Sequence, residues 1–269
     1  MSSMLDYSVF LDFFFENFLF FLLIFIFFSL IWGSFLNMIA YRLIHGGFKR
    51  SRSFCPHCKA TIHWYDNIPI ISYILLWGSC RACKKSISIL YPVIEILTPV
   101  LLLLLYYRVP DYFFWPYFLY FSALIVTIRT DLETMLISRF ATLFLIPVFW
   151  LLAIFNFLPI SFFESIFGAC SAFVCLYLVA RIFVYFMGKE GMGQGDIDLL
   201  GFIGACTGFV GWWFSLLLGS MIGSFIGIIL ILLNRDIRSQ KIPFGPFLSI
   251  GAILYILYGV QIMHVLRLC

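Results

Sequence analysis

Long apolar runs follow one another along most of the chain, and short polar segments separate them. A helix needs about 20 apolar residues to cross the hydrocarbon core of a bilayer, and most of the runs have about that length. They cover residues 18–41, 90–107, 112–128, 140–155, 162–187, 199–233 and 247–266. The run at 199–233 is too long for one span and contains spaced glycines, so we expect two helices there with a turn near Gly208 to Gly211. The pattern predicts about eight transmembrane helices.

The composition excludes a water-soluble protein. Hydrophobic residues make up 63% of the 269 residues and charged residues only 11%, with a mean hydropathy of +1.06. A soluble domain carries about 25% charged residues. We therefore predict an all-α polytopic membrane protein with one small domain outside the membrane. We expect the lipid bilayer among its partners and no nucleic acid.

Basic residues gather in one loop. Eight of the 17 Lys and Arg residues lie in residues 42–89, where Asp66 is the only acid. If this loop is cytoplasmic, the alternating spans leave only Arg108 and Arg267 on the far side, in keeping with the positive-inside rule. Two interpretations of the basic charge stay open: retention of the loop at a cytoplasmic surface of anionic lipid, or guidance of a substrate or cofactor.

Two C-x2-C pairs lie in the same loop, Cys55 with Cys58 and Cys80 with Cys83. Four thiolates on two such turns suit tetrahedral Zn2+, and a reducing cytoplasm makes disulfides the weaker interpretation. His57 and His63 could compete as ligands, although surface histidines are the simpler interpretation. The alternative is four reduced thiols in a small domain held together by its apolar side chains, namely Ile68, Ile70, Ile71, Tyr73, Leu75 and Leu76.

Four carboxylates fall inside or at the edge of predicted spans, where an ionisable group is costly and marks a functional site by default. Glu95 lies one turn into the second apolar run, and Asp131 follows the third. Asp196 and Asp198 lie where the glycine-rich segment GMGQGDIDLL enters the sixth. The topology above places Asp131 and Asp196 at the same face of the membrane.

Asp131 and Asp196 at one apolar boundary suggest a pair that shares a proton. The ionised carboxylate can deprotonate a water molecule while the protonated one polarises a peptide carbonyl, as in aspartic proteases. The glycines beside Asp196 would let an extended backbone approach closely. Two alternatives stay open: ordinary carboxylates at loop ends, and a cation or proton site between the helices of a carrier.

Several segments together resemble one family. They are GSFLN at 33–37, the two cysteine pairs with DNIP at 66–69 between them, EGMGQGD at 190–196 and PFGPFLSIGA at 243–252. The same segments occur in this order in the type IV prepilin peptidases, the bifunctional leader peptidases and N-methyltransferases of bacterial type IV pilus and type II secretion systems. EGMGQGD is similar to the family's GxGD signature.

The resemblance implies that Asp131 and Asp196 are the catalytic aspartates, and that Gly193 and Gly195 are the signature glycines that position the loop and the substrate. It implies removal of a short basic leader after a glycine, from prepilins and pseudopilins, at the cytoplasmic face of the bacterial inner membrane. It also implies methylation of the new N-terminal residue, often phenylalanine, with S-adenosylmethionine, a reaction linked to the cysteine region. We expect the cofactor pocket where that region meets the membrane, near Glu95, unless Glu95 pairs with a loop Arg or Lys.

On this interpretation residues 1–41 form the first transmembrane helix, residues 42–89 the cytoplasmic cysteine domain and residues 90–269 the membrane peptidase domain. A peptidase without methyltransferase activity and an inactive relative are the remaining alternatives.

Three departures from the family pattern motivate the inactive alternative. Asp198 stands where the family usually has lysine. Leu136, Ile137 and Ser138 stand where Pro-Asp is usual, and Arg129 and Thr130 precede Asp131 where apolar residues are usual. We expect Ser138 still to cap the following helix.

Overall fold

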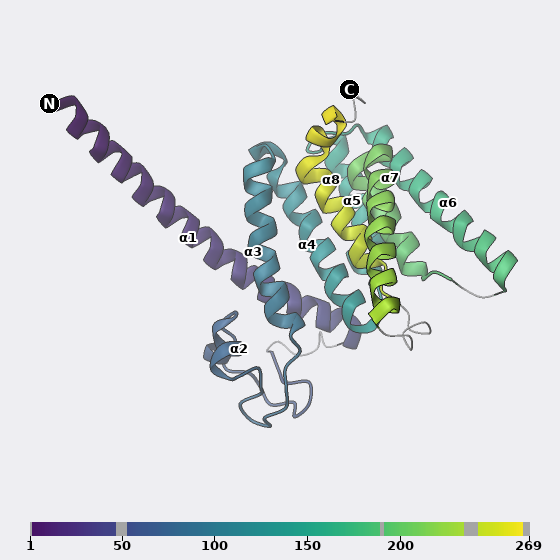
Figure 1. Ribbon diagram of the computed structural model, residues 1–269, viewed down its shortest axis with the longest axis horizontal. Coiled ribbons are helices and arrows are strands. Elements are labelled where there is room, and N and C mark those ends of the chain that lie inside the picture. Colours follow the sequence, from purple (N-terminus) through teal and green to yellow (C-terminus); the bar gives the residue numbers. More distant parts are fainter. Residues whose placement is uncertain (1, 47–52, 189–190, 234–241, 266–269) are drawn as a thin grey trace. The chain divides into compact units, whose positions relative to one another are not determined.

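The computed structural model describes residues 2–46, 53–188, 191–233 and 242–265, and the regular structure within them is helical (Figure 1). In chain order the elements are α1 (Ser2–His45), η2 (Trp64–Asp66), α2 (Ile71–Leu75), α3 (Leu90–Arg108), α4 (Asp111–Thr134), η3 (Arg139–Ala141), η4 (Leu143–Leu145), α5 (Ile146–Ile154), α6 (Phe162–Met187), α7 (Gln194–Leu233) and α8 (Gly245–Val265). Two isolated β-bridges, Phe54 with Thr61 and Ser79 with Ser86, lie between α1 and α3. The predicted all-α class is confirmed.

Five helices of the described chain are long and apolar enough to cross a membrane: α3, α4, α6, α7 and the part of α1 from Phe18. Two shorter apolar helices cover Arg139–Ile154 and Gly245–Gly259. Helix α7 is interrupted at Gly208, whose φ is 71° and ψ is −169°. Glycine adopts these angles readily, but they do not occur within an α-helix. This break confirms the predicted division of the longest apolar run. The run at 140–155 is found as two 3-10 turns followed by the short helix α5, and the other runs lie in α-helices as far as the described residues extend, which confirms the predicted class of polytopic membrane protein.

The chain divides into two compact units. One, which we call the cysteine unit, contains Met1–Met38 and Arg50–Leu103; the other, the aspartate unit, contains Ile39–Lys49 and Leu104–Cys269.

In the cysteine unit, α1 and α3 approach each other closely at a glycine. A Cβ added at Gly33 would lie 2.9 Å from the Thr98 hydroxyl oxygen and 3.1 Å from Glu95 Cα. One turn further on, the buried Asn37 side chain donates a hydrogen bond of 3.0 Å to the Tyr91 carbonyl. The GSFLN segment therefore supplies the small residue and the polar side chain that let these two apolar helices pack together.

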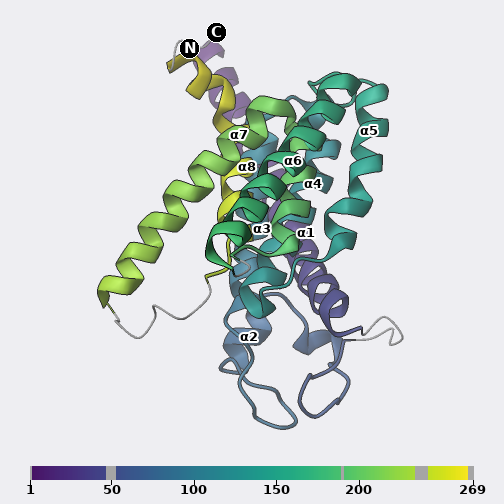
Figure 2. The same ribbon diagram turned by 90° about the vertical axis from the view of Figure 1, so that its right-hand side faces the viewer.

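In the aspartate unit, α7 packs against both α6 and α8 (Figures 1 and 2). Gly168 of α6 and Gly204 of α7 bring the two backbones into contact, because a Cβ on either would overlap the other helix. Beside this crossing, Tyr120 of α4, Phe149 of α5 and Phe202 of α7 form an aromatic cluster with ring centroids 5.2 to 5.9 Å apart. The cluster fixes α4 and α7 against each other, and these are the helices that carry Asp131 and Asp196.

Candidate functional site

Asp131 lies in the last turn of α4 and is buried. The helix ends just beyond it because Met135 adopts a left-handed conformation, with φ of 55°, and donates its N–H to the Asp131 carbonyl at 2.9 Å. This arrangement is a common way for a helix to end. It holds the Asp131 side chain at the point where the chain leaves α4.

The carboxyl group of Asp131 contacts the first residue of α8. Oδ2 of Asp131 accepts a hydrogen bond of 3.0 Å from the backbone N–H of Gly245. A Cβ added at Gly245 would lie only 2.8 Å from the same oxygen, so the contact requires glycine there. Gly245 belongs to the family-like segment at 243–252, but nothing in the local sequence pattern indicates a partner 114 residues away.

Asp196 lies in the first turn of α7, directly after the glycine-rich segment. Its backbone N–H donates to the Gly193 carbonyl at 3.2 Å, which turns the chain into the helix. A Cβ at Gly193 would meet the Asp196 carboxyl group at 3.5 Å, an ordinary contact. A Cβ at Gly195 would lie 2.8 Å from Ile137 Cβ, so in this structure Gly195 makes room for Ile137.

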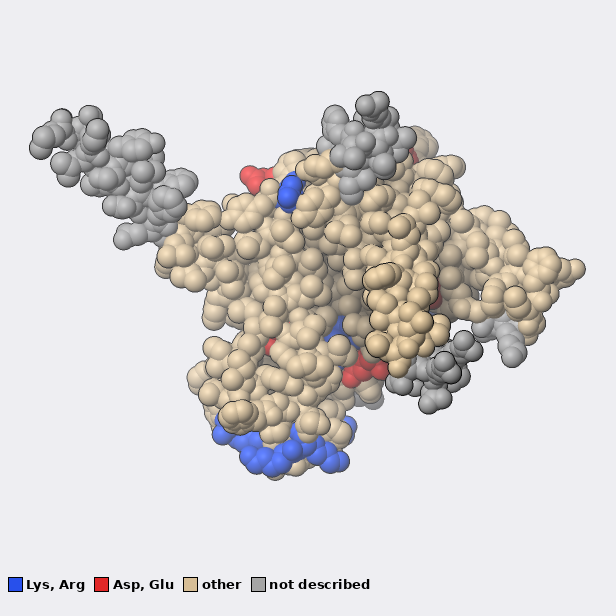
Figure 3. Space-filling model, in the orientation of Figure 1, with Lys and Arg blue, Asp and Glu red and all other residues tan. Residues whose placement is uncertain are grey.

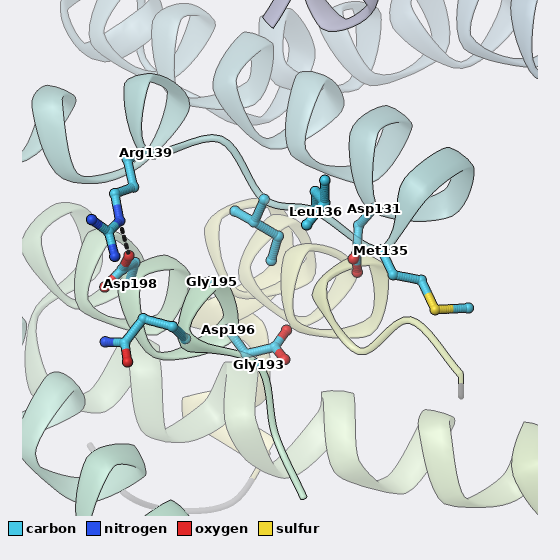
Figure 4. Close-up of a pocket in the computed structure, with 10 residues that line it drawn as sticks. Asp131, Met135, Leu136, Arg139, Gly193, Gly195, Asp196 and Asp198 are labelled. Atoms are coloured by element: carbon cyan, nitrogen blue, oxygen red, sulfur yellow. Dashed lines mark ion pairs between the residues drawn. The ribbon is translucent and has the colours of Figure 1, made fainter. Parts of the chain in front are cut away.

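The structure brings Asp131 and Asp196 to the same pocket, as the topology led us to expect. The pocket has a volume of about 260 Å³, and its lining residues come from the end of α4, from the segment after it and from the start of α7. Figure 4 shows the two carboxyl groups pointing toward each other across the pocket. Two carboxyl groups that face one space can share a proton and act on one substrate bond.

Ion pairs accommodate two of the departures from the family pattern. Asp198 is buried and lies 3.4 Å from the guanidinium of Arg139, on the other side of α7 from Asp196 (Figure 4). Arg129 is also buried and pairs at 2.6 Å with Glu133, one turn along α4. The expectation for Ser138 was wrong: it precedes the 3-10 helix η3, but its side chain makes no capping hydrogen bond, and its carbonyl instead accepts from the Thr142 hydroxyl.

The four cysteines of the loop form a cluster that can hold a metal ion. Their sulfur atoms all lie within 4.8 Å of one another, and Sγ of Cys55 lies 3.9 Å from Sγ of Cys83. Four sulfurs about 2.3 Å from a central Zn2+ lie about 3.8 Å apart in a tetrahedron. The cysteine positions therefore fit this ion, and among the described residues neither His57 nor His63 belongs to the cluster.

The two cysteine pairs have the same local fold. In the first, the Lys59 N–H donates to the Cys55 carbonyl and the Cys55 N–H donates to the Ala60 carbonyl. In the second, the Lys84 N–H donates to the Cys80 carbonyl and the Cys80 N–H donates to the Lys85 carbonyl. Lys59 and Lys84 are both left-handed, with φ of 59° and 58°. Each turn exposes its lysine, and Figure 3 shows the Lys and Arg side chains gathered at the end of this loop, in blue.

The alternative, four reduced thiols in a domain held by an apolar core, finds little support in burial, because none of its six apolar side chains is fully buried. Of residues 53–89, only Cys55 and Ser72 are buried. Ile71 and Leu75, expected in that core, are 54% and 72% exposed, and Trp77 is 93% exposed. A loop with so little buried apolar surface needs another source of stability, and a metal ion bound to the four sulfurs would be such a source.

The pKa values of the cysteine thiols also favour a bound cation. Amide N–H groups of Cys83 and Ala82 lower the pKa of Cys80 to about 7. The Ala60 amide acts to lower the pKa of Cys58, but desolvation and the neighbouring thiols outweigh it and raise this pKa to about 11. Without a cation the thiols therefore cannot all ionise near neutral pH, whereas a bound metal deprotonates its ligands.

A salt bridge connects the second cysteine pair to the segment before α2. The Arg81 guanidinium contacts both carboxylate oxygens of Asp66, at 2.6 to 3.0 Å, and lies 5.6 Å from the centre of the Tyr65 ring. Arg81 lowers the pKa of the Asp66 carboxyl group, and Asp66 in turn raises the pKa of Arg81. The DNIP segment is thus fixed to the second cysteine turn.

Glu95 contacts a backbone amide, and among the described residues it forms no ion pair with an Arg or Lys of the loop. It is buried on α3, and its Oε2 accepts the Ile70 N–H at 2.8 Å. Ile70 has a φ of 64°, an unfavourable conformation for a β-branched residue, so this bond holds a strained turn just before α2. Glu95 therefore fixes the cysteine loop to α3 within the cysteine unit.

Comparisons with known proteins cover both units. A family described as the type IV leader peptidase family matches residues 118–232, and one described as the bacterial peptidase A24 N-terminal domain matches residues 27–109. The prepilin leader peptidase/N-methyltransferase of Aeromonas hydrophila is 35% identical over 90% of this chain and 91% of its own length. Proteins of the same name from Legionella pneumophila and Pseudomonas aeruginosa are each 32% identical, over 88% and 78% of this chain and 91% and 72% of their own lengths. No solved structure matches the chain.

Proposed function

The chain belongs to the type IV leader peptidase family, and on this premise we propose that it removes the short basic leader of prepilins and pseudopilins and methylates the new N-terminal residue. The observation that carries the peptidase half is the pair of carboxyl groups, Asp131 and Asp196, that face one pocket from two different helices. The family and its relatives give no support to a carrier.

The surroundings of the two carboxyl groups suggest a division of labour. Asp131 accepts an amide N–H from the N-terminus of α8, an environment that favours a negative charge. We assign Asp131 as the ionised group that takes a proton from the attacking water. Asp196 then holds the proton that polarises the scissile carbonyl. As the peptide bond breaks, the departing amine takes the proton that Asp131 removed from the water, and Asp131 is ionised again.

This assignment predicts that Asp131→Asn and Asp196→Asn each abolish leader removal. General acid–base catalysis contributes about 100- to 10,000-fold, so the cleavage rate should fall by at least that range. The double variant should be no worse than either single one, because the two groups act as a unit. Asp111→Asn, at the exposed start of the same helix, is the matched control and should cleave normally.

The measurement is the mass of a prepilin incubated with the purified enzyme and S-adenosylmethionine, since leader loss and methyl gain are read in one spectrum. Normal cleavage by Asp131→Asn or Asp196→Asn would contradict the assignment and direct attention to Asp198.

We further propose that Zn2+ occupies the sulfur cluster, held by Cys55, Cys58, Cys80 and Cys83. When bound, it cross-links the two cysteine turns and stabilises the loop. The four sulfur positions and the exposed apolar residues of the loop support this proposal. We also propose that residues 42–89 form a metal-stabilised domain at the cytoplasmic face and that residues 90–269 form the membrane peptidase domain, whose first helix packs within the cysteine unit as far as Leu103.

The methyl transfer needs a neutral N-terminal amine close to the sulfonium of S-adenosylmethionine. An α-amino group has a pKa of about 8, so part of it is neutral near pH 7 and orientation can supply most of the acceleration. A carboxylate suits a cationic cofactor, but Oε2 of Glu95 already accepts the Ile70 amide, so the contact in this structure supports a positioning role. The cofactor contact of Glu95 stays a prediction.

Glu95→Gln tests this prediction through its separate effects on methylation and cleavage. If Glu95 contacts the cofactor, the variant should methylate a pre-cleaved pilin more slowly and with a higher KM for S-adenosylmethionine. Its rate of leader removal should be unchanged. Unchanged methylation kinetics would remove Glu95 from the cofactor site.

A further inference from the structure

A short strap, residues 135–139, lies between the end of α4 and the start of η3 and lines the pocket. It begins at the left-handed Met135, and its first two side chains, Met135 and Leu136, are 50% and 61% exposed. The proposed mechanism uses the carboxyl groups on either side of the strap but gives the strap itself no role.

Ile137, in the middle of the strap, lies against the backbone beside both aspartates. Its Cβ would be 2.8 Å from a Cβ at Gly195, the residue directly before Asp196. Its Cδ1 would be 3.0 Å from a Cβ at Gly245, the residue whose N–H binds Asp131. One side chain therefore reaches from the Asp196 side of the pocket to the Asp131 side.

The strap is held at both ends. At one end the Met135 N–H is bonded to the last turn of α4. At the other, the guanidinium of Arg139 pairs with the buried carboxylate of Asp198 on α7, and Figure 4 shows this pair among the residues that line the pocket. Ile137 is thus fixed between α4 and α7 by contacts on either side of it.

We propose that Ile137 is a specificity-determining residue that leaves room for only a glycine on the leader side of the cleaved bond. The inference rests on the proposed function. The carboxyl groups must flank the scissile peptide, which brings the last leader residue next to Ile137. A Cβ there meets the Ile137 side chain just as a Cβ at Gly195 or Gly245 would. The first residue of the mature protein extends to the other side of the bond, where a large side chain is accepted.

The test compares two prepilins that differ only in the last leader residue, glycine or alanine, with the full-length enzyme in membranes. The wild-type enzyme should cleave the glycine form and discriminate against the alanine form. Ile137→Ala should raise the ratio of kcat/KM for alanine over glycine about 10- to 200-fold, the range that one small apolar group in a pocket controls. Ile137→Val should shift the ratio less and in the same direction.

Ile154→Ala is the matched control, since it makes the same change on α5 outside the pocket and should keep the wild-type ratio. Arg139→Gln removes the ion pair that holds one end of the strap, at a side chain that is itself exposed. It should also raise the ratio of kcat/KM for alanine over glycine. A wild-type ratio in both Ile137→Ala and Ile137→Val overturns the inference; if Ile137→Ala does not fold, the ratio for Ile137→Val decides. Failure of the wild-type enzyme on the glycine form would instead contradict the proposed function.

Discussion

The smallest feature with a consequence for the chemistry is the hydrogen atom that Gly245 carries in place of a side chain. It lets the α8 N-terminus bind the Asp131 carboxyl group directly. In Gly245→Ala the new methyl group would lie 2.8 Å from Oδ2, so the carboxyl group must move. A displacement of about 1 Å in a catalytic group costs about 100-fold, and we expect a 10- to 100-fold loss of kcat for leader removal.

The control for Gly245→Ala is Gly227→Ala on α7, where the new Cβ would make an ordinary contact of 3.6 Å with Ile242. Both variants should reach the membrane in normal amounts. Wild-type kcat in Gly245→Ala would show that the N–H contact to Asp131 does not set the geometry of the carboxyl pair.

Single residues also show where sequence reasoning reaches its limit. Asp131 and Asp196 could be singled out because a carboxylate at the edge of an apolar run is rare and costly. The contacts of Gly245 and Ile137 could not be predicted, since each is formed between segments that are far apart in the sequence. The sequence showed Asp198 only as a departure from the family pattern, and its ion pair with Arg139 became visible in the structure.

At the scale of elements, helices contribute little to the stability of the cysteine loop, and the proposed metal ion would contribute more. The α-helix between the two cysteine pairs, α2, has five residues, and only Ser72 in it is buried. The sequence indicated the four sulfurs from their spacing, but it also suggested an apolar core, because composition does not distinguish buried from exposed isoleucines. The helical runs were predicted more reliably, since a break such as Gly208 follows from the length limit that a bilayer imposes.

Removal of the metal should therefore unfold this loop and leave the peptidase intact. Cys55→Ser or Cys83→Ser should lower bound zinc from about one equivalent to less than half, and trypsin should then cut at the loop lysines and arginines. Leader removal should stay within about twofold of wild type. Cys170→Ser, an exposed cysteine on α6, should change neither property.

The same cluster predicts how zinc retention depends on pH. The ligands bind as thiolates, yet without metal the pKa of Cys58 is raised to about 11 and that of Cys80 is about 7. Protons therefore compete with the metal, and zinc should be lost progressively as the pH falls below 7. Full retention of zinc at pH 5, measured by metal analysis after dialysis, would contradict sulfur ligation by these residues.

At the scale of the whole molecule, the two compact units contain different parts of the proposed machinery. The carboxyl pair and its pocket lie wholly in the aspartate unit, while the four-cysteine cluster and Glu95, for which we propose a link to methyl transfer, lie in the cysteine unit. The polytopic all-α architecture could be predicted because a chain with 63% hydrophobic residues has few other ways to satisfy its backbone. The helices that belong to each unit could not be predicted, since this depends on which helices pack together.

Separate sites lead to a last prediction, that two defective enzymes should together complete the reaction. Asp196→Asn should fail to remove the leader yet methylate a pilin that has already been cleaved. Cys83→Ser should remove the leader and fail to methylate, because the loop linked to methyl transfer loses its metal. If cleaved pilin can pass between enzymes, a mixture of the two variants with prepilin and S-adenosylmethionine should yield mature pilin with the mass of one added methyl group. Each variant alone should not. If Asp196→Asn fails to methylate cleaved pilin, the two activities share the carboxyl pair and the division into two sites is wrong.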